Sequence, residues 1–215
     1  QALANEHVLS TFANSFLLDL TLSELQEDDR IDYVKYSSAR KNHFAIVTYI
    51  KTLVTGKKVY KRALTQEAYR HIEKIYENSY AEVGSGIKML NAKRVDASTI
   101  QYNYISADNL DQKLLVYINA RDKDHIFNIL VMVYNMILNH SVESAYYTEE
   151  FIRVFGTSSL ERDVVQCNNP ANIDLILDNI YLDDNCEQEF ATYVVIDGEW
   201  IFDFPIPTGF IFWRC

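Results

Sequence analysis

The spacing of apolar positions changes along the chain and predicts helices first and strands later. Over residues 3–22 the apolar side chains recur every four residues, which is typical of one face of an amphipathic helix. Apolar residues three or four apart over residues 44–54 predict another helix, and Thr65 is able to cap the next one. We therefore expect residues 1–86 to form a small helical subdomain of three or four helices.

The pattern after residue 86 is mixed. Over residues 99–106 the side chains follow a two-residue repeat, and strand-forming residues are frequent, so we expect a strand there. Residues 113–119 are a second candidate strand. Residues 124–140 fit either a helix or a buried strand, and we favour the helix. A further helix is expected over 143–155.

The last part of the chain carries the strongest turn signal. Pro170 is well placed in the first turn of a helix over 170–182. Asp197 and Gly198 stand between two β-rich segments, which predicts a tight hairpin. Residues 208–214 would then add a final strand.

These elements together predict an α+β fold. The order of a helix followed by strands in residues 141–214 is similar to cystatin-like folds, in which one helix packs across an antiparallel sheet. We therefore expect a helical subdomain over residues 1–86 and a cystatin-like α+β subdomain over residues 87–215.

Composition fits a folded protein. The chain has 215 residues, of which 48% are hydrophobic and 23% charged, so it can bury a sizeable core. No apolar run approaches the roughly 20 residues that span a bilayer. Residues 1–100 hold 14 Lys and Arg against 12 Asp and Glu, whereas residues 101–215 hold 6 against 18. Because phosphate backbones would repel the acidic half, nucleic acid is not an expected partner.

Few residues of the chain carry a sequence signal for reactive chemistry. Cys167 and Cys186 flank the helix expected after Pro170, and a disulfide between them would suit an oxidising compartment; otherwise they are ordinary buried residues. The five histidines lack the spacing of a metal site, and the acidic loop over residues 183–189 departs from the standard calcium loop. There is no glycine-rich phosphate loop and no nucleophile elbow. We therefore expect no metal, no cofactor and no catalytic residue.

Tyrosine is the residue type best suited to binding a ligand here. The chain holds fifteen tyrosines, and each offers a flat apolar ring with one hydroxyl. The candidate ligand-binding residues are Tyr102, Tyr104, Tyr146, Tyr147 and Tyr193.

The layout resembles the extracytoplasmic sensor domain of a bacterial two-component histidine kinase. The residues that carry this likeness are the amphipathic start over 3–22, the strand over 102–106, the Asp197-Gly198 turn and the apolar segment over 210–213. The chain also begins at Gln1 rather than Met, as a processed protein or an excised domain would.

The resemblance implies a periplasmic, membrane-tethered domain that converts a ligand or the state of the envelope into rearrangement of a homodimer. It implies no catalytic activity in this chain. Two alternatives remain: a secreted or lipid-anchored small-ligand-binding protein with a cystatin-like cone, or a hydrolase or isomerase of that same fold whose acidic side chains and histidines converge only in three dimensions.

Overall fold

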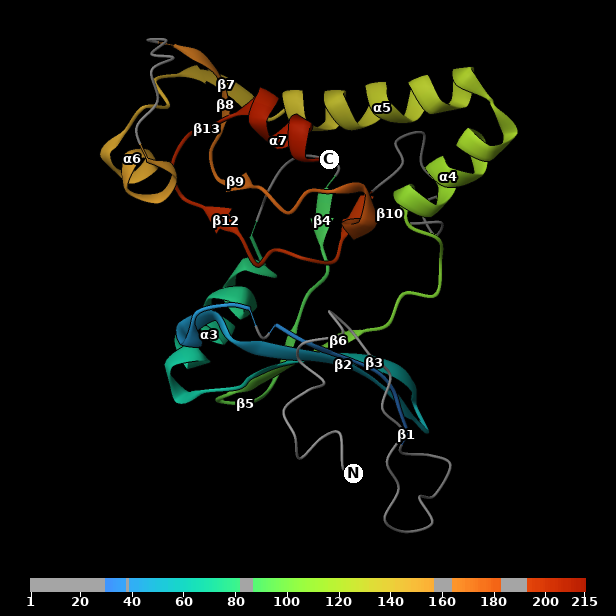
Figure 1. The fold of residues 1–215 in the computed structure, drawn as a ribbon, viewed down its shortest axis with the longest axis vertical. Helices are drawn as coiled ribbons and strands as arrows, with labels where there is room; N and C mark the ends of the chain where they lie inside the picture. The colour runs from blue at the N-terminus through green and yellow to red at the C-terminus, as the bar shows by residue number, and fades with distance from the viewer. Residues whose placement is uncertain (1–29, 38, 82–86, 157–163, 183–192) are drawn as a thin grey trace. The chain divides into compact units, whose positions relative to one another are not determined.

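The computed structural model describes residues 30–37, 39–81, 87–156, 164–182 and 193–215 (Figure 1). The fold is α+β, as the sequence predicted. The chain divides into two compact units that interleave in sequence. Unit 1 comprises residues 1–77 and 91–106, and unit 2 comprises residues 78–90 and 107–215, whereas the sequence placed a single boundary after residue 86.

Unit 1 contains a five-stranded antiparallel sheet. Its strands, in spatial order, are β1 (Arg30–Tyr36), β2 (Ile46–Leu53), β3 (Gly56–Ala63), β6 (Thr99–Asn103) and β5 (Lys93–Asp96). A tight turn joins β2 to β3, and Gly56 there has a φ of 102°, which favours glycine. The strand predicted over residues 99–106 is confirmed as β6.

The helix predicted over residues 44–54 is wrong, because β2 occupies most of this segment. The predicted helical face consisted of apolar residues three or four apart, whereas residues three apart in a strand, such as Val47 and Ile50 of β2, lie on opposite faces. The β-branched residues of β2 favour the strand. Tyr49 on β2 stacks on Tyr60 of β3 at 4.9 Å between ring centroids, a cross-strand contact that adds to the pairing. The predicted helix over 3–22 lies outside the described residues.

One helix of unit 1 was predicted correctly. α3 (Tyr69–Asn78) follows the short 3-10 helix η3 (Gln66–Ala68). Thr65 caps this segment, since its Oγ1 accepts a hydrogen bond from the backbone N–H of Ala68 at 3.3 Å. Ile72 and Ile75 are buried at 2% and 1% exposure.

Asp32 on β1 joins three neighbours within unit 1. Its Oδ2 accepts from Thr52 Oγ1 at 2.7 Å and lies 2.9 Å from Lys57 Nζ, and its Oδ1 lies 2.7 Å from Arg30 Nε. The hydrogen bond from Lys57, then those from Thr52 and Arg30, hold the pKa of this carboxyl well below its ordinary value.

This arrangement predicts an acid-dependent contribution to stability. We expect Asp32→Asn to lower the free energy of unfolding by about 1 kcal/mol at pH 7, a value that allows for solvent screening. Because the folded-state pKa is depressed, this difference is present above the unfolded-state pKa of about 3.9 and is lost as the pH falls through the folded-state pKa. Urea unfolding between pH 7 and pH 3, with Asp108→Asn as the exposed control, measures it. A difference that stays constant over this range would contradict the assignment.

In its described residues, unit 2 combines helices with three small sheets. Its helices are α4 (Leu110–Ala120), α5 (Lys123–Leu138), α6 (Glu149–Phe155) and α7 (Thr208–Arg214). The first sheet has the order β10 (Ile180–Leu182), β11 (Tyr193–Val195) and β4 (Ile87–Met89). The second pairs β12 (Ile201–Phe202) with β9 (Ala171–Asn172), and the third has the order β13 (Ile206–Pro207), β8 (Val165–Asn168) and β7 (Ser141–Ser144). β4 and β11 are parallel, and the other pairs of unit 2 are antiparallel.

Two helical predictions for unit 2 are confirmed at least in part. The ambiguous segment 124–140 is helical, as favoured. The helix predicted over 143–155 is shorter than expected and forms α6, which ends at Gly156.

Three other predictions for unit 2 are wrong. Residues 113–119 belong to α4, which begins with a capping box between Asn109 and Gln112. Residues 170–182 form β9, a turn, the 3-10 helix η4 (Leu177–Asn179) and β10 in place of a helix. Residues 208–214 form α7, because the strand before it, β13, already ends at Pro207.

The predicted Asp197-Gly198 hairpin is also absent. The flanking segments pair with different partners, β11 with β10 and β4, and β12 with β9. Consequently the described strands of residues 87–215 do not build one antiparallel sheet under a helix, which is what the cystatin-like prediction required.

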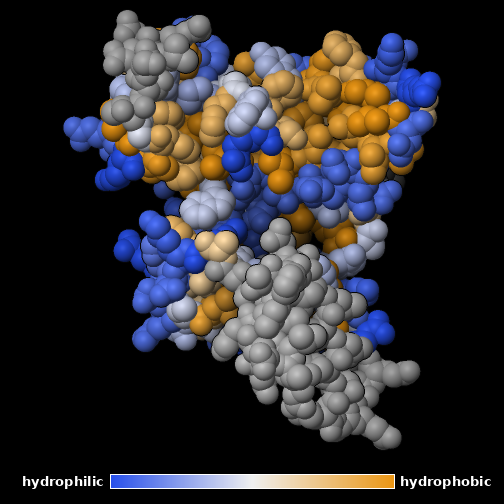
Figure 2. All heavy atoms as spheres, viewed as in Figure 1, coloured by the Kyte–Doolittle hydropathy of each residue, from blue (hydrophilic) through white to orange (hydrophobic). Residues whose placement is uncertain are grey.

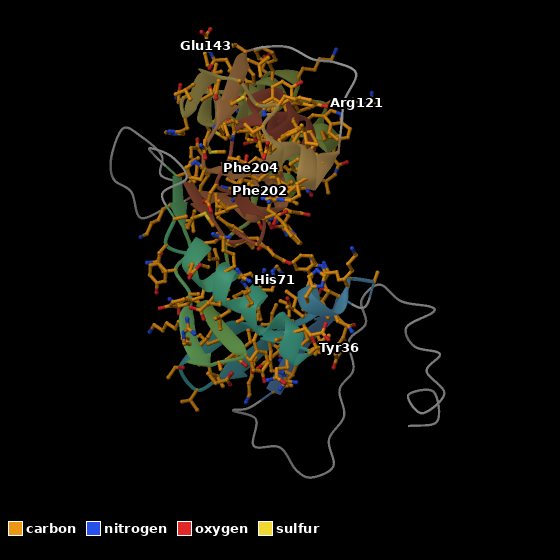
Figure 3. All side chains as sticks on the ribbon, turned by 90° about the vertical axis from the view of Figure 1, so that its left-hand side faces the viewer. Tyr36, His71, Arg121, Glu143, Phe202 and Phe204 are labelled. Carbon is orange, nitrogen blue, oxygen red and sulfur yellow. The ribbon has the colours of Figure 1, made fainter. Side chains whose placement is uncertain are left out.

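Aromatic side chains fill one side of unit 2. Phe202 and Phe204 lie together (Figure 3), with ring centroids 5.2 Å apart. The ring centroid of Phe155 of α6 lies 5.7 Å from that of Phe202 and 6.4 Å from that of Phe204.

The helices α4 and α5 leave apolar side chains exposed, including Val116 at 63% and Phe127 at 66%. The space-filling view shows much hydrophobic surface (Figure 2). Among the helices in the described ranges, none combines the length and apolar character needed to cross a bilayer.

Candidate functional site

A loop in unit 2 gathers the acidic and amide side chains that stand out chemically. It runs from Asn172, the last residue of β9, to Asn179, the last residue of η4. Pairing of β9 with β12 holds its start, and pairing of β10 with β11 holds its end. The loop is therefore anchored on two sheets, which suits residues that must be held in place.

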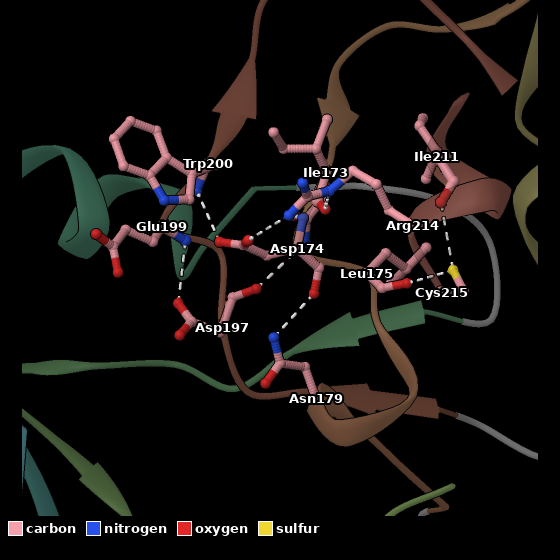
Figure 4. Close-up of polar contacts among 11 residues, drawn as sticks. Ile173, Asp174, Leu175, Asn179, Asp197, Glu199, Trp200, Ile211, Arg214 and Cys215 are labelled. Carbon is pink, nitrogen blue, oxygen red and sulfur yellow. Dashed lines mark hydrogen bonds and ion pairs between the residues drawn. The ribbon is translucent and has the colours of Figure 1, made fainter. Parts of the chain in front are cut away.

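Asp174 lies at the turn of this loop (Figure 4). Its backbone N–H donates to Asn172 Oδ1 at 2.9 Å, and its Oδ2 accepts from the backbone N–H of Trp200 at 3.2 Å. Its Oδ1 lies 3.9 Å from Arg214 Nη2, in an ion pair. The side chain is 15% exposed, so the carboxylate is partly buried and remains accessible.

Asn179 connects the end of the loop to Asp174. Its Nδ2 donates to the backbone carbonyl of Asp174 at 2.9 Å, which directs the amide oxygen away from that bond. Its own backbone carbonyl accepts from the N–H of Ile196 at 3.0 Å. The loop is thereby tied to the segment that follows β11.

Asp197 belongs to that following segment. Its backbone carbonyl accepts from Asn172 Nδ2 at 3.3 Å, and its Oδ1 accepts from the backbone N–H of Glu199 at 3.1 Å. Figure 4 shows Asp174, Asn179 and Asp197 around the same loop. The residue pair that the sequence assigned to a hairpin turn therefore contributes a carboxylate to this cluster.

Gly198 is required by close packing. A Cβ atom on Gly198 would lie 2.7 Å from Met89 Cε and 3.1 Å from Ile201 Cδ1. Its carbonyl accepts from Asn78 Nδ2 at 2.7 Å, in a buried hydrogen bond. The backbone beside Asp197 is thus fixed from two sides.

These side chains offer oxygen atoms to a hard cation. The carboxylate of Asp197 and the amide oxygen of Asn179 are ligand types that Mg²⁺ accepts, with the remaining positions filled by water or phosphate. Across the described residues there is no cluster of three or more His, Cys, Asp and Glu that could hold a metal by itself. A cation here would therefore need further oxygens from a substrate.

Unit 1 holds a buried cation of its own. Lys61 lies on β3 and is 7% exposed, on the same face of the strand as Val59 and Ala63. In the neighbouring helix α3, Glu73 forms an ion pair with Arg94 of β5.

The predicted tyrosine site is divided between the two units. Tyr102 is buried on β6, and Tyr104, just after β6, is 41% exposed with Lys57 Nζ 5.7 Å from its ring centroid. In unit 2, the ring centroids of Tyr146 and Tyr147 lie 6.1 Å apart. Tyr193 lies on β11, and burial raises its pKa. A ligand-binding role for these residues stays a prediction.

The other predicted features fall partly beyond the described ranges. Cys167 is buried on β8, and burial raises the pKa of its thiol. Its proposed partner Cys186 lies outside the described residues, as does the acidic loop over 183–189.

The loop was not among the sites predicted from the sequence, although the sequence contains a signal for it. Asp174 and Leu175 are followed by Asn179 four residues later, and then by Asp197 and Gly198. Asp174 and Asn179 stand five residues apart, and the Asp-Gly pair adds a second carboxylate, so the oxygen-bearing residues of the cluster follow one another in this order along the chain. The Asp-Gly pair was assigned to a turn, so its relation to Asp174 was not considered.

No protein-family model, no curated protein and no solved structure matches this chain.

Proposed function

We propose that this chain is a phosphotransferase of the protein-kinase type, which transfers the γ-phosphoryl group of a nucleoside triphosphate to a hydroxyl acceptor. The observation that carries the proposal is the hydrogen-bonded cluster of Asp174, Asn179 and Asp197. Asp174 and Asn179 match in type and spacing the catalytic-loop Asp and Asn of protein kinases. Asp197 stands in the place of the Asp of their Asp-Phe-Gly segment, but Gly198 follows it directly and the Phe is missing.

Asp174 acts as the catalytic base in this proposal. The acceptor oxygen forms a bond to the γ-phosphorus, and the bond from that phosphorus to the bridging oxygen breaks. The electron pair of the broken bond remains on the nucleoside diphosphate, and the hydroxyl proton passes to the carboxylate of Asp174. The Trp200 N–H and Arg214 hold that carboxylate in place.

Asp197 and Asn179 would hold the divalent cation. Such a cation neutralises charge on the phosphate oxygens. The donor types fit, because both side chains present oxygen, and hydrogen bonds to Glu199 and Asp174 already orient them.

Unit 1 supplies support independent of this loop. In protein kinases a lysine on the third strand contacts the nucleotide phosphates. Lys61 is a buried lysine on the third strand of a five-stranded antiparallel sheet, and α3 follows that strand.

The chain also departs from the kinase pattern. Asn172 and Ile173 stand where kinases carry His and Arg, and the segment between β1 and β2 contains no glycine. Phosphate contacts from a glycine-rich loop are therefore not part of this proposal.

The sensor-domain hypothesis stays a prediction, together with its periplasmic location, membrane tether and homodimer. The alternative of a cystatin-like hydrolase or isomerase with converging acidic residues and histidines differs from this proposal, because the cluster of Asp174, Asn179 and Asp197 contains no histidine and the described strands do not form a cystatin-like sheet.

Binding of MgATP tests the proposed function. We expect the wild-type protein to bind MgATP and to release phosphate slowly with water as the acceptor. Asp197→Asn should weaken MgATP binding by about tenfold or more, because a cation ligand is lost. Isothermal titration calorimetry and a phosphate-release assay measure the two effects.

Asp203→Asn is the matched control, since Asp203 is an exposed aspartate in the same segment. It should bind MgATP as the wild type does. Absence of MgATP binding in the wild type, or equal affinities for the two variants, would overturn the proposal.

A further inference from the structure

We infer that Arg214 of α7 is the positioning residue for Asp174, so that α7 sets the geometry of the catalytic loop; this inference rests on the proposed function. The Arg of the His-Arg-Asp segment in kinases is replaced here by Ile173. In this chain Arg214 of α7, about 40 residues further along the sequence, contacts the same loop through a hydrogen bond to the backbone carbonyl of Ile173.

Arg214 makes two contacts to consecutive loop residues. Its Nε donates to the carbonyl of Ile173 at 2.8 Å, and its Nη2 lies 3.9 Å from Asp174 Oδ1. The planar guanidinium presents several N–H groups in a fixed fork, so one side chain can hold a backbone carbonyl and orient the adjacent carboxylate. With the Trp200 N–H on Oδ2, both oxygens of Asp174 have an orienting group.

The neighbouring Cys215 adds a third connection from α7 to the loop. Its Sγ–H donates to the carbonyl of Leu175 at 2.7 Å. Burial raises the pKa of Cys215 to about 11, so the thiol keeps its proton at neutral pH. Arg214 at the end of α7 and Cys215 just after it therefore contact three consecutive loop residues, Ile173, Asp174 and Leu175, through separate groups.

α7 itself is firmly held, which a positioning element needs. Ile211 is 2% exposed, and Thr208 Oγ1 donates to Asn168 Oδ1 at 2.9 Å. Phe212 packs against Tyr134 of α5 with ring centroids 5.2 Å apart. Arg214 thus projects to the loop from a helix anchored on two other elements.

A double-mutant cycle between Arg214 and Asp174 tests this role. With MgATP as substrate and water as acceptor, we expect Arg214→Gln to lower kcat by about tenfold and to leave KM within about twofold. Arg214→Lys should recover part of the loss, because it restores the charge without the fork. In the Asp174→Asn background, Arg214→Gln should cost less than about twofold further, because the group it positions is already inactive. Arg153→Gln, an exposed arginine on α6, should leave kcat unchanged in both backgrounds.

A second measurement does not depend on turnover. The N–H of Trp200 donates to Asp174 Oδ2, so its hydrogen exchange, followed by NMR, reports the position of that carboxylate. We expect Arg214→Gln to speed this exchange several-fold and to leave the N–H of Ile196, bonded to Asn179, unchanged.

The outcomes separate the two proposals. Lack of MgATP turnover in the wild type would overturn the proposed function. The hydrogen exchange of the Trp200 N–H in Arg214→Gln would still show whether Arg214 positions the carboxylate of Asp174. Equal losses of kcat in both backgrounds, or unchanged exchange at Trp200, would overturn the inference for Arg214 alone.

Discussion

Asp174→Asn is expected to lower the rate of phosphoryl transfer by about 10²- to 10⁴-fold, the usual contribution of a general base. Asparagine keeps the size of the side chain and an oxygen that can accept from the Trp200 N–H, so the loop should keep its shape. What it loses is the carboxylate that takes the acceptor proton. MgATP affinity should change little, because the cation ligands assigned here are Asp197 and Asn179.

Steady-state kinetics of phosphate release from MgATP, with calorimetry for binding, measures both quantities. Asp178→Asn is the matched control: Asp178 lies in the same loop, is exposed, and has no role in the proposed transfer. Its kcat should equal that of the wild type. A kcat for Asp174→Asn within a fewfold of the control would contradict the assignment of Asp174 as the base.

Ile180→Ala is expected to cost about 2–5 kcal/mol of unfolding free energy, which is the range for truncating a fully buried isoleucine. Ile180 is 0% exposed and follows Asn179 directly, at the start of β10. It pairs with Val195 on β11, which is also 0% exposed. Removal of its side chain leaves a cavity at the end of the loop over residues 172–179.

Such a loss is large against the 5–15 kcal/mol that stabilises an ordinary domain. Urea unfolding at pH 7 measures it. Val142→Ala, on an exposed valine of β7, is the control and should change stability by no more than about 0.5 kcal/mol. Similar costs for the two variants would show that the core around β10 is not packed as the structure has it.

Local signals were sufficient where neighbouring residues determine the conformation. Helix spacing over 124–140, the cap at Thr65 and the strand over 99–106 were all predicted correctly from the sequence. Each depends on periodicity or on a bond between residues three apart.

Local signals failed where a segment depends on a distant partner. The spacing over 44–54 predicted a helix, yet pairing of β2 with β1 and β3 makes this segment a strand. Residues 113–119 look like a strand by composition, yet the capping box at Asn109 and packing of α4 against α5 make them helical. Tertiary context outweighs propensity in both cases.

By itself the sequence determined the α+β class, several helices, and the order of Asp174, Asn179 and Asp197 along the chain. Only the tertiary structure decided that these residues meet, because β11 pairs with β10 and β4 instead of folding back on β12. Hydrogen bonds between residues about 25 apart, such as the one from Trp200 to Asp174, depend on that pairing. A local turn propensity at Asp197-Gly198 could not reveal it, since strand pairing is settled by the packing of whole segments.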